Sequence, residues 1–138
     1  MNKIEENRRL IENIFAELER GNTAPFVDAL DDAVRWTTPG SSVWSRSFAG
    51  KASVLNDLLG PVRAQLVKRV QLTVRQVLAD RDVVVVEAKG RATTKRGLPY
   101  ENDYCFLYRL AGGKIVEVTE YLDTELASTR LEAPWRRP

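Results

Sequence analysis

The first thirty residues are patterned for helices. Apolar side chains recur at three- and four-residue spacing and fall on one face of a helix: Ile4, Ile11, Ile14, Phe15 and Leu18. Asn2 and Glu5 resemble a capping-box pair at its start, and Gly21 is a natural stop. A shorter helix is predicted over residues 23–30, where Thr23 can cap it and Pro25 is tolerated in the first turn.

A third helix is predicted over residues 51–67. Its apolar stripe consists of Val54, Leu55, Leu58, Leu59, Val62 and Leu66. Gly60-Pro61 inside this stripe predicts a kink or a division, because proline has no N–H to donate to the preceding turn. Between the second and third helices, residues 34–38 are typical of a short strand, and the loop to Gly50 carries Trp44 and Phe48.

From Val70 onward the pattern changes to alternation. Strands are predicted over residues 70–80, 83–94, 100–110 and 114–122, with a slip of phase at Val77-Leu78 that indicates a bulge. Gly112-Gly113 is a strong hairpin signal between the last two strands. Helices followed by an antiparallel meander define an α+β class. Four consecutive valines, 83–86, need cover on both faces of the sheet, which favours a homodimer.

The final strand contains the most informative position. Glu120 shares one face with Val116, Val118 and Leu122 by the period-two rule. A carboxylate in an apolar row must be paired, protonated or functional. The pattern therefore predicts a pocket with Glu120 in its wall, where the group either acts as a general acid or base or merely pairs with Lys or Arg.

Composition narrows the chemistry. The chain has 138 residues, 43% of them apolar, which suits one domain. The net charge of +2 arises from 21 basic and 19 acidic residues that are interspersed, which argues against a nucleic-acid surface. Arg130 and Arg136-Arg137 are interpreted as part of a short solvated tail from about residue 127.

The absent residue types exclude several mechanisms. The chain has no histidine and one cysteine, Cys105, so histidine-dependent triads and an internal disulfide are excluded and most zinc sites are disfavoured. We expect no metal and no cofactor. The charged N-terminus and the lack of any long apolar stretch predict no signal peptide and no membrane span, and hence a cytoplasmic location.

Three sequence patterns resemble the NTF2-like superfamily, in its SnoaL-like and ketosteroid-isomerase-like branch. They are residues 35–40 with 45–51, residues 99–104, and residues 113–123. The resemblance covers about residues 3–126. It implies a cone, the NTF2-like or cystatin-like roll, in which a curved antiparallel sheet packs on three N-terminal helices and encloses a pocket. It also implies a single domain over residues 1–138, commonly a homodimer through the outer sheet face.

This chain lacks the complete set of catalytic residues of two enzyme types that belong to this superfamily. At the positions of the ketosteroid isomerases' tyrosine and two aspartates, this chain has Ile14, Thr38 and Phe106, which disfavours that isomerase chemistry. At the positions that resemble the arginine and aspartates of the limonene-epoxide-hydrolase type, it has Glu87, Lys89 and Glu120. Glu87 and Lys89 have the acidic and the basic residue in the reverse order. One hypothesis is therefore that a different set of three charged residues acts in the pocket.

The sequence does not decide which side chains of residues 83–91 face the inside of the cone. The resemblance turns Glu87 and Lys89 inward as catalytic partners of Glu120. Composition alone favours the opposite, with Glu87 and Lys89 on a solvated face and the residues between them inside.

The candidate ligand-binding residues are mostly aromatic or polar: Trp36, Thr38, Trp44, Arg46, Asn102 and Tyr104. The tryptophans are expected in the pocket wall, and Arg46 beside the loop aromatics is a candidate contact for an anionic substrate. Asn102 and Tyr104 either orient a ligand oxygen or water, or are hydrogen-bonded groups at the wet end of the core.

The functional interpretation has three alternatives. The first is a cofactor-independent isomerase, hydrolase, hydratase or cyclase that acts on a small apolar oxygenated molecule through a pocket carboxylate. The second is a ligand-binding protein without catalysis, and the third is a dimeric protein-interaction module. An enclosed cavity of roughly 300 Å³ or more with Glu120 in its wall favours the first two.

Overall fold

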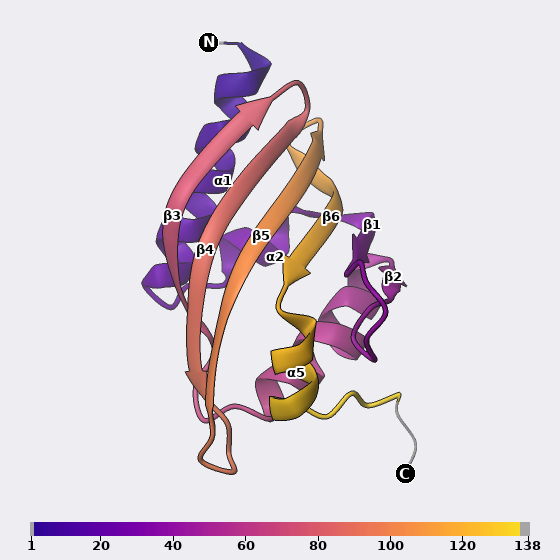
Figure 1. The fold of residues 1–138 in the computed structure, drawn as a ribbon. Coiled ribbons are helices and arrows are strands. Elements are labelled where there is room, and N and C mark those ends of the chain that lie inside the picture. Colours follow the sequence, from indigo (N-terminus) through magenta and orange to yellow (C-terminus); the bar gives the residue numbers. More distant parts are fainter. Residues whose placement is uncertain (1, 136–138) are drawn as a thin grey trace.

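A curved six-stranded sheet forms one side of the molecule, and helices cover its concave face (Figure 1). The computed structural model describes residues 2–135. The strand order is β2-β1-β6-β5-β4-β3. The strands are β1 Leu30–Thr37, β2 Ser47–Ala49, β3 Gln71–Asp80, β4 Val83–Thr93, β5 Pro99–Ala111 and β6 Lys114–Leu122. The predicted α+β cone is thus confirmed.

One strand pairing departs from the expected antiparallel pattern. β1 and β6 run parallel, with Trp36 opposite Val118, whereas every other neighbouring pair is antiparallel. The sheet is therefore mixed. This pairing brings Trp36 and Thr38 beside the strand that carries Glu120, although they are more than eighty residues away in the chain.

The first helix, α1 (Lys3–Glu19), follows the prediction closely. Asn2 Oδ1 accepts a hydrogen bond from Glu5 N at 2.9 Å, which is the expected cap. The buried face of α1 places Phe15 against two rings of β5, with centroid distances of 6.1 Å to Phe106 and 6.0 Å to Tyr108. α1 is thereby fixed against the concave face of the sheet.

The second helix, α2 (Ala24–Ala29), lacks the predicted cap. The Thr23 side chain makes no capping hydrogen bond, and Asn22 Oδ1 instead accepts from Ala24 N at 3.2 Å. Pro25 lies in the first turn, as expected.

The third helical segment is divided as the sequence indicates. It consists of α3 (Lys51–Ser53), a π-helical stretch η1 (Val54–Leu59) and α4 (Gly60–Ala64). Gly60 N donates to Leu55 O, five residues back, and Pro61 follows with no N–H to give. The predicted kink or division therefore corresponds to this wider, π-helical turn.

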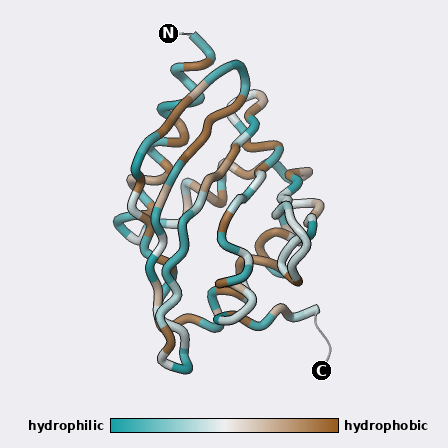
Figure 2. The backbone as a smooth tube through the Cα atoms, viewed as in Figure 1, coloured by the Kyte–Doolittle hydropathy of each residue, from teal (hydrophilic) through white to brown (hydrophobic). Residues whose placement is uncertain are grey.

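Side chains alternate cleanly along β4 and β5. On β4, Val84, Val86 and Ala88 are fully buried, whereas Val83 and Val85 are half-buried on the outer face. Figure 2 shows the hydrophobic stretch of β4 beside the hydrophilic turn at residues 80–82. The predicted change of phase in β3 is present, and the register shift falls between Val74 and Gln76.

The C-terminal segment is not a solvated tail as far as Trp135. Residues Thr124–Arg130 form a further helix, α5, and the Asp123 side chain caps it by accepting from Leu126 N at 3.0 Å. Leu131 and Ala133 are buried beyond it. Trp135 packs on the 43–48 loop, with Nε1 donating to Val43 O at 2.9 Å. The basic pair Arg136-Arg137 lies outside the described residues.

Within residues 2–135, no helix is both long enough and apolar enough to cross a bilayer.

Candidate functional site

A cavity of about 510 Å³ lies between the concave face of the sheet and the helices. Its wall is almost entirely apolar and takes side chains from all layers of the fold, among them Phe15, Trp36, Leu58, Phe106 and Leu131. The volume is in the range of small-molecule sites. The inside of the cone is therefore hollow rather than filled by its own side chains.

Glu120 is the one carboxylate in the described wall of this cavity. Its Oε1 accepts two hydrogen bonds, from Trp36 Nε1 at 3.1 Å and from Thr38 Oγ1 at 3.3 Å. Both donors come from the end of β1, which lies parallel to β6. No described residue donates a hydrogen bond to the second oxygen, Oε2. The carboxyl group is therefore anchored by one oxygen and has the other available to a ligand.

Burial raises the pKa of the Glu120 carboxyl above its ordinary value, and the hydrogen bonds from Trp36 and Thr38 reverse this only in part. The side chain is half-buried because it borders the cavity, while protein surrounds it on the remaining sides. A carboxyl group whose pKa moves toward neutrality is suited to both accept and return a proton.

A tyrosine cluster faces the same cavity. Tyr104 Oη donates to Tyr100 Oη at 3.3 Å, and Asn102 Nδ2 also donates to Tyr100 Oη, at 3.4 Å. Because the Tyr100 oxygen accepts both bonds, its own hydrogen is available, and no described residue accepts it. Tyr100 is nearly fully buried and lines the cavity, so this hydrogen is a donor for a ligand oxygen.

The three tyrosines of the wall stay in their neutral form. Burial raises the pKa of Tyr100, and it holds the pKa of Tyr104 and of Tyr108 well above the ordinary value. The charge of Glu120 adds to the increase at each of them. These hydroxyl groups are thus hydrogen-bond donors and acceptors rather than bases.

Most of the predicted pocket residues lie where the sequence placed them. Glu120, Trp36, Thr38, Trp44 and Tyr104 all line the cavity. Trp36 and Thr38 reach Glu120 through the parallel pairing of β1 with β6, and Tyr104 lies on the buried face of β5.

Asn102 does not line the cavity and matches the second of its two predicted roles, that of a hydrogen-bonded group of the core. It is buried but behind the wall, where Oδ1 accepts from Asp123 N at 2.9 Å and Nδ2 donates to Asp123 O at 3.1 Å. It therefore fixes the junction between β6 and α5 and holds the Tyr100 hydroxyl, rather than contacting the cavity.

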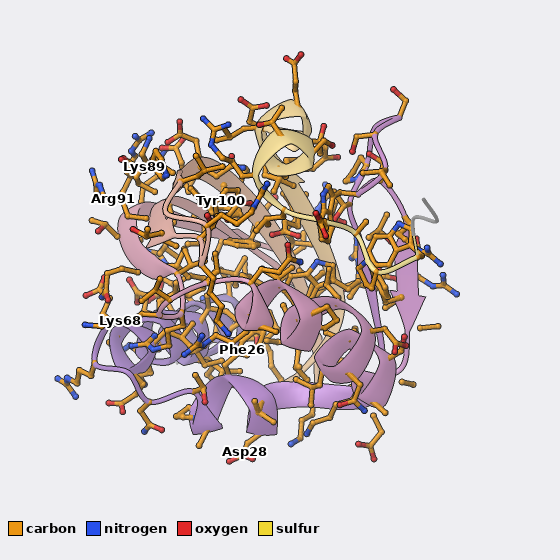
Figure 3. The ribbon with its side chains drawn as sticks, turned by 90° about the horizontal axis from the view of Figure 1, so that it is seen from below. Phe26, Asp28, Lys68, Lys89, Arg91 and Tyr100 are labelled. Atoms are coloured by element: carbon orange, nitrogen blue, oxygen red, sulfur yellow. The ribbon has the colours of Figure 1, made fainter. Side chains whose placement is uncertain are left out.

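Three predicted site residues point away from the cavity. Glu87 and Lys89 are on the outer face of β4, where Lys89 Nζ lies 3.6 Å from Asp103 Oδ1 and Gln76 donates to Glu87 at 3.4 Å. Figure 3 shows Lys89 and Arg91 extending outward while Tyr100 lies inside. Val84, Val86 and Ala88 occupy the inner face of β4 and leave Glu87 and Lys89 on the outer face. The inward orientation of Glu87 and Lys89 that the resemblance implied was therefore wrong.

Arg46 is the third. Its guanidinium carbon lies 4.4 Å from the centre of a Trp135 ring and 5.5 Å from the Phe48 ring. It is an exposed cation stacked on these aromatic rings and does not line the cavity, and its contact with an anionic substrate stays a prediction.

The polar lining residues that were not predicted include Tyr100, Tyr108, Arg63 and Arg69. The tyrosines had a usable signal, since they share their strand face with Tyr104 by period two. The arginines had none, because Arg63 lies in a helix and Arg69 in the turn before β3, where no local pattern indicates which way a side chain points.

Among residues 2–135, no three His, Cys, Asp or Glu side chains gather closely enough to hold a metal ion. The polar groups of the lining residues are a single carboxylate, several hydroxyls, two indole N–H groups and two guanidiniums. This set is suited to hydrogen bonding and proton transfer with an organic molecule.

Taken together, the fold and the site define a pocket-bearing cone with one carboxyl group in its described wall. The sequence profile of the SnoaL-like domain matches residues 11–118, which is most of the chain. The protein belongs to the SnoaL-like domain family. A search of curated proteins finds no match.

Solved structures agree with this fold. A candidate SnoaL-like polyketide cyclase from Jannaschia sp. CCS1 superposes with a TM-score of 0.78 at 16% identity, over 97% of each chain. Bal32a, from a soil-derived mobile gene cassette, gives 0.78 at 18% identity over 94% of this chain and 97% of its own. TerC, co-crystallised with polyporic acid, gives 0.74 at 20% identity over 90% and 96%. At these identities the similarity concerns the fold.

Proposed function

We propose that the protein is a cofactor-independent acid–base catalyst that acts on a small, mostly apolar, oxygenated molecule held in the cavity. The observation that carries the proposal is Glu120, a carboxyl group with one anchored oxygen and one unbonded oxygen in an otherwise apolar wall. Isomerisation, hydration and ring closure share one elementary step that this group can perform, which is the transfer of a proton to or from a bound molecule.

Tyr100 complements Glu120 in this proposal. Its hydroxyl hydrogen is available to a ligand oxygen, and a hydrogen bond there would stabilise negative charge that develops when a neighbouring carbon loses a proton. Asn102 is a positioning residue, since it holds the Tyr100 oxygen and the backbone of Asp123 together.

Two relatives support a role of this kind. One is a candidate polyketide cyclase of the same fold, and the other was crystallised with the organic molecule polyporic acid. Neither identifies the substrate of this chain.

Exchange of carbon-bound hydrogen tests the proposal without knowledge of the substrate. We suggest 2-tetralone in D₂O, followed by NMR. The Glu120 carboxylate takes a proton from C1, the electron pair of the C–H bond moves into the enolate, and a deuteron from the exchanged carboxyl group returns to carbon. We expect exchange faster than in buffer, loss of this acceleration in Glu120→Gln, and a partial loss in Tyr100→Phe.

The outer-face residue Glu87 provides the matched control. Glu87→Gln removes the same charge from the opposite side of the sheet and should exchange like the wild type. Equal acceleration by the wild type and Glu120→Gln would refute the catalytic role of Glu120.

Binding without catalysis is the second candidate. It is favoured by the outward orientation of Glu87 and Lys89, which leaves Glu120 without the charged partners expected of a relay. In that case 2-tetralone binds with no acceleration of exchange, and Glu120→Gln changes only the affinity.

A homodimer through the outer sheet face accompanies both candidates. Half-buried Val83 and Val85 lie on that face of β4, and Tyr121, 49% exposed, lies on the same face of β6. Sedimentation at micromolar concentration should give twice the mass of the chain, and Tyr121→Glu should shift it toward the monomer. A wild-type monomer at that concentration would contradict the dimer.

A further inference from the structure

The opening of the cavity carries positive charge. Three of the lining residues are exposed, Thr23, Gly60 and Arg63, and they mark where the cavity meets solvent, between the start of α2 and α4. Arg69, which is half-buried, lines the same cavity from the turn before β3. Two arginine side chains therefore border an otherwise apolar site.

Arg69 is held in place by the end of α1. Its Nη1 donates to Leu18 O at 2.7 Å, a carbonyl of the last helical turn. The Arg69 fork lies so close to Gly21 that a Cβ there would be 3.0 Å from Nη2. Its Nε and Nη2 make no hydrogen bond to any described residue. Arg69 is thus pre-positioned, with donors to spare.

Arg63 is tethered more loosely. Its Nη1 donates to Leu66 O at 3.2 Å, within the same stretch of chain. Over the described residues, neither Arg63 nor Arg69 has a carboxylate oxygen within 4.0 Å, in contrast to Arg109, which pairs with both Asp82 and Glu117. The charge at the opening is not neutralised by the protein.

The cavity consequently has two electrostatic ends. Glu120 lies on β6 and Arg69 immediately precedes β3, three strand positions away in the sheet order. At about 4.8 Å per strand this separation is roughly 14 Å across the sheet. A negative group on a ligand is attracted to the arginines and repelled by ionised Glu120, so it is kept at the opening.

We infer that the cavity selects an apolar molecule bearing a carboxylate, with the carboxylate on Arg63 and Arg69 and the apolar body directed toward Glu120. The planar fork of arginine matches the two oxygens of a carboxylate, and each of these arginines has unused donors for it. This inference rests on the proposed function, since it names the substrate class of that site.

A pair of probes with one skeleton tests the inference. We suggest 2-naphthoate and 2-naphthamide, which differ in charge and have nearly the same shape, measured by calorimetry at low salt. We expect the wild type to bind the naphthoate about tenfold or more tightly than the amide, and this ratio to fall as salt rises. The double variant Arg63→Gln/Arg69→Gln should reduce the ratio to near one with little change in the affinity for the amide.

Lys68 is the matched control. It is exposed, lies one residue from Arg69 and does not line the cavity; Figure 3 shows it at the periphery of the molecule. Lys68→Gln removes the same charge and should keep the wild-type ratio. Since Arg69 also holds the end of α1, Arg69→Lys serves as a second variant that retains the charge and should retain most of the ratio.

The outcomes separate the two proposals. Equal wild-type affinities for the two probes, or a ratio that the double variant does not change, would overturn the carboxylate inference while leaving the cavity function in place. A ratio reduced as much by Lys68→Gln as by the double variant would also overturn it, because the effect would then be one of net charge. Failure of both probes to bind the wild type would contradict the cavity function and the inference together.

Discussion

Replacement of Glu120 by glutamine should stabilise the protein at neutral and alkaline pH. Glutamine keeps the shape and an oxygen that accepts from Trp36 and Thr38, and it replaces the second oxygen, which accepts no hydrogen bond from a described residue, by an uncharged NH₂ group. The folded-state pKa of Glu120 is raised by burial, which means that ionising this group costs more in the folded than in the unfolded chain. Each unit of pKa difference corresponds to about 1.4 kcal/mol.

The sign of the pH dependence follows from which state ionises first. Below the unfolded-state pKa, about 4.3 for glutamate, both states are protonated and the wild type carries no penalty. As the pH rises, the unfolded chain ionises first, and the folded wild type loses stability until the pH exceeds the raised folded-state value. Glu120→Gln has no such loss. The two proteins should therefore have similar stability near pH 4 and differ at pH 8.

Unfolding by urea at both pH values measures this effect. For a partly compensated polar group in an apolar wall we expect the variant to be more stable by about 1–3 kcal/mol at pH 8, or about 3–4 °C in Tm per kcal/mol for a chain of this size. The difference should largely vanish at pH 4. A variant that is less stable than the wild type at pH 8, or a difference that is the same at both pH values, would refute the reasoning about the buried charge.

Three further substitutions test the architecture around the site, each by urea unfolding. Gly90→Ala should destabilise by about 1–3 kcal/mol, because the new Cβ would lie 2.6 Å from Cε2 of Tyr104; an unchanged midpoint would contradict the close packing. Asn102→Leu should cost about 2–4 kcal/mol, since the N–H and C=O of Asp123 lose their partner, and a neutral result would mean that water replaces it freely. Trp135→Ala should cost about 2 kcal/mol through lost ring contacts, whereas no cost would show that the C-terminal segment is not docked.

Local periodicity was sufficient for much of the fold. α1, its Asn2 cap, the kink before Pro61 and the hairpin at residues 112–113 all follow from patterns that span one or two turns or strands. The orientation of Glu120 was predicted from its parity with Val118 and Leu122 on one strand. The same parity was wrong for Val116, because a register shift between Ile115 and Glu117 places Ile115 in the core instead.

Pairing between strands that are distant in the sequence could not be predicted from those local patterns. Nothing local indicates that β1 lies parallel to β6, and this pairing is what supplies the two hydrogen bonds to Glu120. For β4 the alternation itself was ambiguous, because valines occupy both parities of residues 83–86 and both interpretations fitted. Only packing decided that Val84 and Val86 are inside and Lys89 is outside.

The burial of side chains in residues 131–135 was indicated by their apolar pattern, but the neighbouring charges favoured another interpretation. Leu131, Ala133 and Trp135 are apolar at alternate positions, which is typical of a strand-like segment lying on a surface. The surrounding arginines favoured a solvated tail instead. Charged residues beside alternating apolar ones are compatible with docking, because the charges point outward while the apolar side chains are buried.

The most direct test of the central claim is a crystal structure of the protein with 2-tetralone. The account predicts the ketone inside the cavity, with its oxygen within hydrogen-bonding distance of Tyr100 Oη and its reactive carbon facing Glu120 Oε2. A cavity closed by its own side chains, or a ketone bound only outside it, would contradict the claim that this site binds a small apolar molecule and transfers its proton.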